Sequence, residues 1–329
     1  MGPPAPEPEV VRARGLSFRY RGSGKGLESL DLDVEAGEVL AVVGPNGSGK
    51  STLLRLLATD RIAGDGSLTL FGLPAAPPSP QLRRRIAFAP DEGPHLSALT
   101  GRENLDLFRA LRGRAAGPSH RRQDALLEAF SLGREADRPV AEYSFGMRRK
   151  LLLLEAIAGA PDLLLLDEPS IGLDAPGLGA LQSEIRSRSG AGGTVVLATN
   201  ELRELPFWAD RVLLLDRGRR LVCDTPGALL QELQGRTRIR IALAPHPPEW
   251  RAPLERELRT VPHVHAVGGE AGFVEVQSTA GGAPLPALLS LVLDAGLEVR
   301  DVHLSEPGLA DVFEALTGRR LEHDDGGTS

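Results

Sequence analysis

The sequence has little of three features that would each indicate a class of protein. It has one cysteine, Cys223, in 329 residues, which excludes an internal disulfide and is typical of a reducing compartment. No run of apolar residues approaches the roughly 18 to 20 that are needed to cross a bilayer. The formal net charge is −6, so the excess of Lys and Arg typical of nucleic-acid-binding domains is missing. Any role at a membrane is therefore expected to come through a partner chain.

Length and composition predict two folded domains between polar ends. The chain has room for one large and one small domain, and 41% of its residues are apolar, which is enough for real cores. Residues 1–8 are rich in proline and lack a positive leader region, so we expect a disordered leader and not a signal peptide. We also expect the polar residues 319–329 to form a disordered tail.

Residues 39–57 carry the most informative pattern. The apolar run Val39–Val43 predicts a buried strand, and the leucines of residues 53–57 predict a helix. The segment between them fits the phosphate-binding pattern G-x-x-x-x-G-K-[S/T]: Gly44, Pro45, Asn46, Gly47, Ser48, Gly49, Lys50, Ser51 and Thr52. In this pattern Lys50 reaches the β and γ phosphates, and the hydroxyl of Ser51 helps to hold Mg²⁺. The sequence therefore predicts a nucleoside triphosphate bound with Mg²⁺.

A second pattern places two acids at the end of an apolar strand. Leu163–Leu166 is followed at once by Asp167 and Glu168. Because ligands bind outside the carboxyl ends of strands in α/β sheets, Asp167 is expected to reach Mg²⁺ and Glu168 the attacking water. Some twenty residues earlier, Ser144 and Gly146 start a predicted helix, whose N-terminus is a second candidate anion site.

The remaining pattern predicts an α/β fold with a parallel sheet. The runs Leu163–Leu166 and Thr194–Ala198 do not alternate in polarity, which is typical of strands buried on both faces. A β-rich opening precedes the phosphate loop, and a helical subdomain is expected over about residues 82–160. Thr100 and Glu103 have the spacing of a capping box.

The C-terminal part predicts a separate small domain, residues 237–318. Its expected order is βαββαβ, which is that of a ferredoxin-like module. The expected elements are strands at 238–243, 263–267, 272–277 and 297–304, with helices at 252–259 and 284–294. A last helix is predicted at Leu309–Thr317. His263 and His265 lack carboxylate or cysteine neighbours in the sequence, so they are interpreted as ordinary polar positions and not as metal ligands.

With these motifs in place, residues 9–233 resemble the ATP-binding subunit of ABC transporters. The phosphate loop and Asp167-Glu168 match that family's two Walker motifs, and Asp174 matches the aspartate of its D-loop. Tyr20 matches the aromatic residue that stacks on adenine. Within the segment Ser144, Phe145, Gly146 and Met147, which stands at the family's signature, Ser144 and Gly146 match the serine and the second glycine of that sequence. The variant YS-x-GM, together with the closing helix at Glu306–Gly318, resembles the type-2 branch, which includes drug, sodium and haem exporters.

This resemblance implies an ATPase that works in a dimer. Two cassettes, identical or different, would bind head to tail, so that each phosphate loop closes against the other subunit's signature. The expected partners are this second ATP-binding subunit and a separate transmembrane permease, and no nucleic acid. The subunit would be cytoplasmic and peripheral on the inner face of the membrane. The cargo stays open, because the permease determines it.

Three positions depart from the family pattern. Asn200 stands where the family usually has a histidine, Asp91 where it has a glutamine, and Phe145 where it has the first glycine of the signature. By the resemblance, Asn200 acts with Glu168 in catalysis, and Asp91 offers an oxygen to Mg²⁺. Because Glu168 is present, we expect slow hydrolysis and not its absence.

Two other functions are open at this point. In one, the chain is an ATP-dependent dimerisation switch with vestigial hydrolysis, which Asn200 and Asp91 favour. In the other, it is an ABC protein that works on ribosomes or DNA. Proteins of that kind usually have two cassettes or a basic extension, and this sequence shows neither.

Overall fold

The computed structural model describes residues 9–22, 24–75, 79–93, 95–111, 120–200, 208–231, 233, 237–245, 250–270 and 272–319. The chain divides into two compact units, one ending at Pro226 and the other beginning at Gly227. Within the described ranges, no helix is both long enough and apolar enough to span a bilayer. The predicted leader and the predicted tail beyond Arg319 lie outside these ranges.

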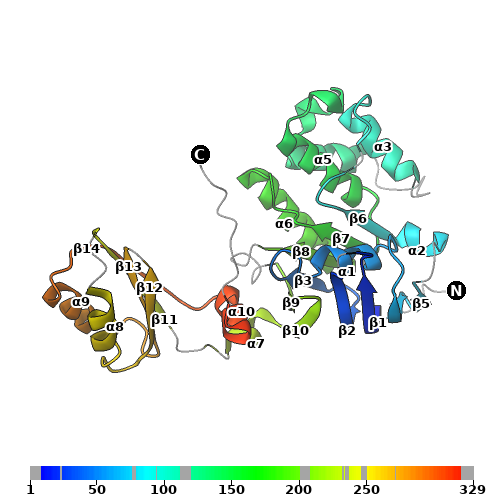
Figure 1. The fold of residues 1–329 in the computed structure, drawn as a ribbon. Coiled ribbons are helices and arrows are strands. Elements are labelled where there is room, and N and C mark those ends of the chain that lie inside the picture. The colour runs from blue at the N-terminus through cyan, green and yellow to red at the C-terminus, as the bar shows by residue number, and fades with distance from the viewer. Residues whose placement is uncertain are drawn as a thin grey trace. The chain divides into compact units, whose positions relative to one another are not determined.

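The first unit is built around a six-stranded sheet (Figure 1). Its order is β10-β9-β3-β8-β7-β6, and all neighbours pair in parallel except the β9–β10 hairpin. The strands are β3 (Val39–Val43), β6 (Ile86–Ala89), β7 (Leu163–Asp167), β8 (Thr194–Thr199), β9 (Arg211–Asp216) and β10 (Arg219–Asp224). Every residue of β3, β7 and β8 is buried, which confirms the predicted parallel core.

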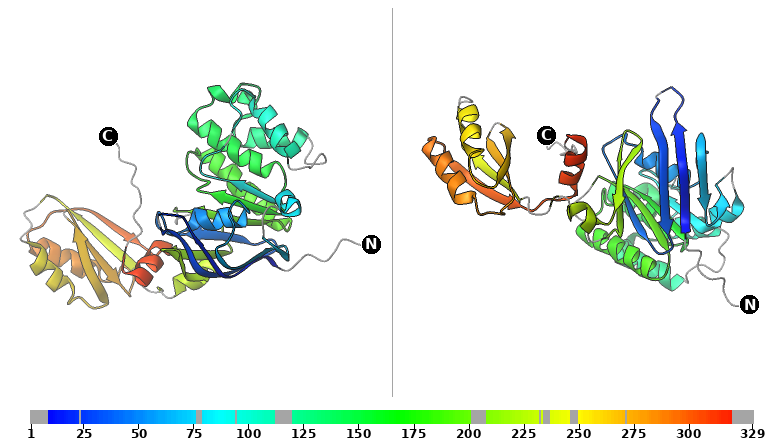
Figure 2. Two further views of the ribbon diagram at one scale, coloured as in Figure 1. Left: turned by 45° about the vertical axis from the view of Figure 1, so that its right-hand side comes forward. Right: turned by 90° about the horizontal axis from the view of Figure 1, so that it is seen from below.

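A second, antiparallel sheet lies in the same unit, in the order β2-β1-β4-β5. Its strands are β1 (Glu9–Arg19), β2 (Gly26–Glu35), β4 (Asp65–Leu70) and β5 (Leu73–Pro74). Helix α1 (Lys50–Leu57) contacts β2 on one side and β7 and β8 on the other (Figure 2). Leucines of α1 and side chains of both sheets therefore share one apolar core.

The helices of this unit are α2 (Pro80–Arg85), α3 (Gly101–Leu111), α4 (His120–Ala129), α5 (Phe145–Ile157) and α6 (Ala175–Gly190), with short 3-10 turns at Gly133–Glu135 and Val140–Glu142. The predicted capping box is confirmed: the Thr100 N–H donates to Glu103 Oε2 at 2.8 Å, and the Glu103 N–H donates to Thr100 Oγ1 at 3.2 Å. One expectation was wrong. Residues 86–89 form β6 of the central sheet instead of part of the helical subdomain.

The second unit has the predicted βαββαβ order, preceded by α7 (Pro226–Gln231) at the boundary. Its elements are β11 (Thr237–Leu243), α8 (Arg251–Leu258), β12 (Val264–Glu270), β13 (Phe273–Ser278), α9 (Leu285–Asp294) and β14 (Val299–Ser305). The strand order is β12-β13-β11-β14, with every neighbouring pair antiparallel, as in a ferredoxin-like module. Ile239 and Ile241 of β11 and Leu288 of α9 lie at the centre of its apolar core.

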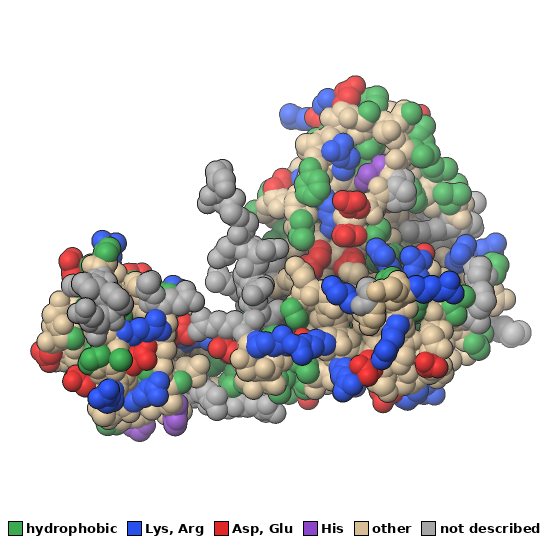
Figure 3. Space-filling view, viewed as in Figure 1, with side chains coloured by type: hydrophobic (Ala, Val, Ile, Leu, Met, Phe, Trp, Pro, Cys, Tyr) green, Lys and Arg blue, Asp and Glu red, His purple; other side chains and the backbone are tan. Residues whose placement is uncertain are grey.

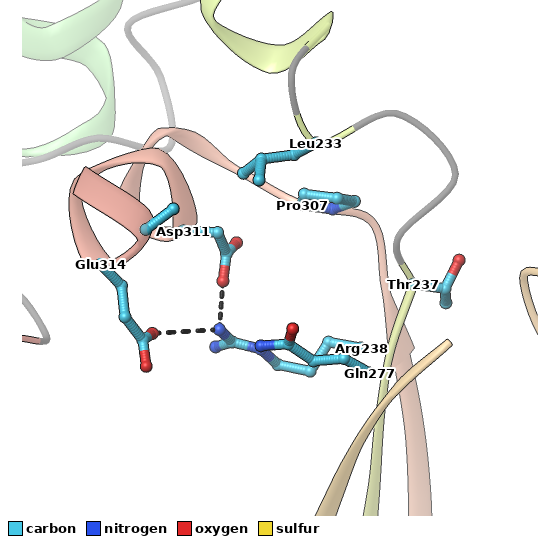
Figure 4. A pocket seen from close by; sticks show the side chains of 8 residues that line it. Leu233, Thr237, Arg238, Gln277, Pro307, Asp311 and Glu314 are labelled. Atoms are coloured by element: carbon cyan, nitrogen blue, oxygen red, sulfur yellow. Dashed lines mark hydrogen bonds and ion pairs between the residues drawn. The ribbon is translucent and has the colours of Figure 1, made fainter. Parts of the chain in front are cut away.

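The last helix, α10 (Leu309–Thr317), is held to β11 by one arginine. Arg238 donates to the carboxylates of Asp311 and Glu314 and lies 3.4 Å from Glu275 Oε1 (Figure 4). Arg238, Asp311 and Glu314 border a cavity of about 120 Å³. Arg238 forms all three of these ion pairs with carboxylates of its own unit.

The burial of the parallel sheet predicts how a core substitution changes the stability of the first unit. Leu165 of β7 is fully buried in the apolar core, between Phe88 of β6 and Val196 of β8. Leu165→Ala should lower the free energy of unfolding of the first unit by about 2–5 kcal/mol, because it leaves a cavity. Leu111→Ala, at an exposed position, should change it by less than about 0.5 kcal/mol. Urea unfolding followed by circular dichroism measures both, and equal effects would contradict this packing.

Candidate active site

The phosphate loop connects β3 to α1, as the sequence predicts. Gly49 precedes α1 with φ 110°, a left-handed conformation that glycine adopts without strain. Gly44 lies so close to the main chain that a Cβ atom there would be 2.1 Å from the carbonyl oxygen of Leu215. These glycines let the chain turn sharply and begin the helix at Lys50. The first N–H groups of α1 are thereby directed at the loop, as an anion site requires.

Lys50 is buried at the centre of the site, with 6% of its side chain exposed. Its Nζ donates to the carbonyl of Gly44 at 2.7 Å and to Asn200 Oδ1 at 2.6 Å, and lies 3.8 Å from Glu168 Oε1. Burial lowers the pKa of Lys50, and the negative charges of Glu168 and Asp167 offset part of that effect. Lys50 is thus a desolvated cation that an anionic ligand can approach.

Asp167 ends β7 and is 2% exposed. Neither of its carboxylate oxygens makes a hydrogen bond within the described part of the chain. Burial raises the pKa of Asp167, and the nearby hydroxyl of Ser51 offsets part of the rise. Because buried carboxylates are rarely left without a partner, this side chain is suited to a cation at the site. Oxygen ligands of this kind are those that Mg²⁺ prefers.

Glu168 is fixed by hydrogen bonds to the main chain at the end of the neighbouring strand β8. Its N–H donates to the carbonyl of Ala198 at 2.8 Å, and its Oε2 accepts from the N–H of Asn200 at 3.1 Å. Its φ of 46° is uncommon for a residue with a side chain. Burial raises the pKa of Glu168, although Lys50 lowers it in part. The result is a fixed carboxylate beside the phosphate loop.

A single cavity of about 320 Å³ joins these groups. Tyr20 and Asp91 border it as well, although Asp91 Oδ1 accepts from the N–H of Glu92 at 3.1 Å. Figure 3 shows acidic side chains in the middle of this unit's visible face, with Lys and Arg side chains below them. The residues that line the cavity are Tyr20, Lys25, Gly26, Asn46, Gly47, Ser48, Gly49, Lys50, Ser51, Thr52, Asp91, Asp167 and Glu168. Lys25 and Gly26, which follow Tyr20 in the chain, belong to no sequence motif and were not predicted.

The signature residues do not line this cavity. Ser144 caps α5, and its Oγ accepts from the N–H of Met147 at 3.2 Å. Phe145 is 59% exposed, and Gly146 approaches the carbonyl oxygen of Gly172. The structure therefore places Ser144–Met147 outside the cavity. Of the other predicted site residues, Gly44, Pro45 and Asn200 do not line it either.

Asp174 also lies outside the cavity, at the start of α6. Its Oδ1 accepts from the N–H of Gly177 at 2.9 Å, and its Oδ2 lies 2.9 Å from Nζ of Lys150. The Lys150 contact lowers the pKa of Asp174. This carboxylate caps α6 and ties it to α5.

Comparison with known proteins gives this site a family. A family model described as ABC transporter matches residues 27–171. The daunorubicin resistance ATP-binding protein DrrA2 of Streptomyces coeruleorubidus is 36% identical over 320 residues, which cover 95% of this chain and 97% of the relative. The chain belongs to the ATP-binding subunits of ABC transporters. Members of this family are ATPases, and the relatives place this one in the type-2, exporter-like branch, as the sequence predicts.

Two further similarities agree with this assignment. The Nod factor export ATP-binding protein I of Burkholderia lata is 32% identical to this ATP-binding subunit, over 90% of this chain and 93% of the relative. The solved structure of an ATP-binding subunit of an ABC transporter superposes with a TM-score of 0.64 at 27% identity. That likeness covers 68% of this chain and 93% of the other. The predicted cassette fold is thus confirmed.

The lack of partners for Asp167 leads to a prediction about stability. An acid whose pKa is raised by folding destabilises the folded state above that pKa, and the penalty disappears as the pH falls toward its ordinary value. Asp167→Asn should therefore stabilise this ATP-binding subunit at pH 8, and the gain should shrink as the pH falls through the folded-state pKa of Asp167 toward pH 4. Thermal unfolding without nucleotide or Mg²⁺, measured across this pH range, tests the prediction. A gain that stays constant over the whole range would contradict it.

Proposed function

We propose that this chain binds MgATP and hydrolyses it in a head-to-tail dimer that drives a separate membrane permease for export. The observation that carries the proposal is the cavity that joins the phosphate loop to Lys50, Asp167 and Glu168. Membership of the ABC ATP-binding subunits supports it. So do the names of two relatives, which refer to daunorubicin resistance and Nod factor export. We further propose a cassette over residues 9–233 and an accessory domain over residues 237–318.

The residues of the cavity divide the chemistry among them. The phosphate loop and Lys50 would bind the β and γ phosphates, with Tyr20 against the adenine ring. Ser51, Asp167 and Asp91 would hold Mg²⁺, which neutralises charge on the phosphate oxygens when bound. Glu168 would orient the attacking water, because its carboxylate is fixed by the N–H of Asn200. Burial raises the pKa of Glu168, which makes it a stronger base than an exposed glutamate.

Asn200, at the position of the family's usual histidine, makes two side-chain hydrogen bonds beside the phosphate loop. Its Oδ1 accepts from Lys50 Nζ, and its Nδ2 donates to Asn46 Oδ1 at 3.1 Å. An incoming γ phosphate would compete with Asn200 for the ammonium of Lys50. Because asparagine cannot carry a positive charge, it stabilises the charge on the transferring phosphoryl group less than a protonated histidine would. Slow hydrolysis follows from this exchange.

A phosphate-release assay tests the chemistry. Wild type should release phosphate from MgATP, and Glu168→Gln should reduce the rate about 10²–10⁴-fold, because the water loses its base. Asn200→His should raise the rate above wild type by up to about 10²-fold. Glu28→Gln is the matched control, since this glutamate pairs with Arg219 away from the cavity. If wild type and Asn200→His both bind MgATP without turnover, hydrolysis by this chain is refuted.

The position of the signature supports the proposed dimer. Since Ser144–Met147 lie outside the chain's own cavity, a second ATP-binding subunit would bring its signature to the bound nucleotide. The N-terminus of α5, capped by Ser144, would then offer its N–H groups to the γ phosphate. On hydrolysis this contact is lost and the dimer opens, which would move the permease. The subunit would thus be cytoplasmic and held at the membrane by that partner.

Mixing two inactive variants tests whether the site is shared. Lys50→Ala removes the phosphate-loop cation, and Ser144→Arg blocks the signature, so each purified variant should be inactive. An equal mixture should regain about a quarter of the wild-type rate, because half of the dimers are mixed and each of those has one intact site. The rate should rise with protein concentration. Full activity of Ser144→Arg alone, or no recovery in the mixture, would contradict the head-to-tail arrangement.

A further inference from the structure

Arg149 is a buried cation whose hydrogen bonds all end on main-chain carbonyl oxygens in the described part of the chain. It lies in the second turn of α5 and is 5% exposed. Its Nη1 donates to the carbonyls of Pro90, at 3.1 Å, and Asp91. Its Nη2 donates to the carbonyls of Asp167, at 3.3 Å, and Glu168, at 2.7 Å. Its Nε donates to the carbonyl of Ile171 at 3.4 Å. One guanidinium therefore links α5 to the ends of β6 and β7 and to the loop after β7.

The arrangement uses a property that only arginine has. The guanidinium is planar and rigid, and its donors point outward in a fixed fork. Nη1 fixes the peptides that carry Asp91, and Nη2 fixes those that carry Asp167 and Glu168. Because β6 and β7 are neighbours in the sheet, these two contacts set the spacing of the two strand ends. A lysine, with a single nitrogen, could reach only part of this set.

Burying the Arg149 cation costs free energy of solvation. Burial lowers the pKa of Arg149, and the negative charges of Asp91, Asp167 and Glu168 act in the opposite direction. Its donors go to the carbonyls of these residues, so their carboxylates are left for the cavity. Arg149 thus holds the acidic residues in place through their main-chain carbonyls, without occupying their carboxylate oxygens.

The geometry points to Arg149 as a positioning residue that sets the relative placement of the magnesium-binding and water-orienting carboxylates from the signature helix. The inference rests on the proposed function. It adds that the position of α5 determines, through this one side chain, where Asp91, Asp167 and Glu168 lie at the ends of β6 and β7 in the same subunit. The alternative is a purely structural role, in which Arg149 only anchors α5 to the core. Its loss would then lower stability and leave the ATPase activity of the folded fraction intact.

The test uses Arg149→Lys and Arg149→Met in the full chain, with Arg148→Met as the matched control at the exposed neighbouring position. Three quantities are measured on protein shown to be folded by thermal unfolding: kcat and KM for ATP, the Mg²⁺ concentration for half-maximal turnover, and the affinity for a fluorescent ATP analogue with and without Mg²⁺. We expect kcat to fall on the order of 10²-fold in Arg149→Met, with KM changed less than about threefold. Arg149→Lys should fall between this variant and wild type, and Arg148→Met should equal wild type.

The Mg²⁺ readout separates this inference from the proposed function. In wild type, Mg²⁺ should strengthen binding of the analogue, and in both Arg149 variants this gain should shrink about tenfold, while binding without Mg²⁺ stays the same. If wild type shows no turnover, the proposed hydrolysis fails, and the binding measurement still decides the role of Arg149. If the Met variant does not fold, the Lys variant is decisive. A wild-type kcat and a wild-type Mg²⁺ gain in folded Arg149→Lys would overturn the inference, as would losses that follow the unfolded fraction alone.

Discussion

The parallel pairing of β3, β8, β7 and β6 is the constraint on which the site depends. These strands are buried between α1 on one side and α5 and α6 on the other, so their interiors have no room for polar groups. Polar residues can appear only where the strands end, and parallel strands end at one edge. Gly44, Asp91, Asp167 and Asn200 all lie within two residues of such an end. The cavity is therefore a direct result of sheet topology.

Gathering charge at a buried edge opposes stability. Lys50, Asp167 and Glu168 each lose hydration, and burial shifts the pKa of each toward its neutral form. Lys50 and Glu168 compensate each other in part by their opposite charges, and the main chain adds the carbonyl of Gly44 for Lys50 and the N–H of Asn200 for Glu168. The carboxylate oxygens of Asp167 make no hydrogen bond among the described residues, and only nearby groups such as the hydroxyl of Ser51 offset part of its pKa rise. This is the pattern of a site that keeps one strong ligand unpaired for a cation and stabilises the rest.

How much could be predicted depended on whether a pattern was local. The strand, loop and helix at Val39–Leu57 are specified by adjacent residues, as is the capping box at Thr100, and both were predicted. Strand β6 was missed, because a run of four residues at 86–89 has no periodicity to tell strand from helix and becomes a strand only by pairing with β7. Lys25 and Arg149 were missed for a related reason. Their roles depend on contacts between segments distant in sequence, which no spacing in one sequence records.

Helix α5 joins the two parts of the proposed cycle because of its dimensions. Ser144, at its N-cap, and Arg149 are five residues apart, which is about 7.5 Å of helix at 1.5 Å per residue. A segment this short, buried beyond its first turn, moves as a rigid body. A nucleotide that binds at the Ser144 end would therefore displace the guanidinium of Arg149 together with the helix. Since that guanidinium holds the carbonyls of Asp91 and Glu168, occupation of one subunit's signature would be communicated to the carboxylates of the same subunit's own site. Two nucleotide sites linked in this way would each respond to the occupation of the other without any further structural element, while each could still turn over by itself.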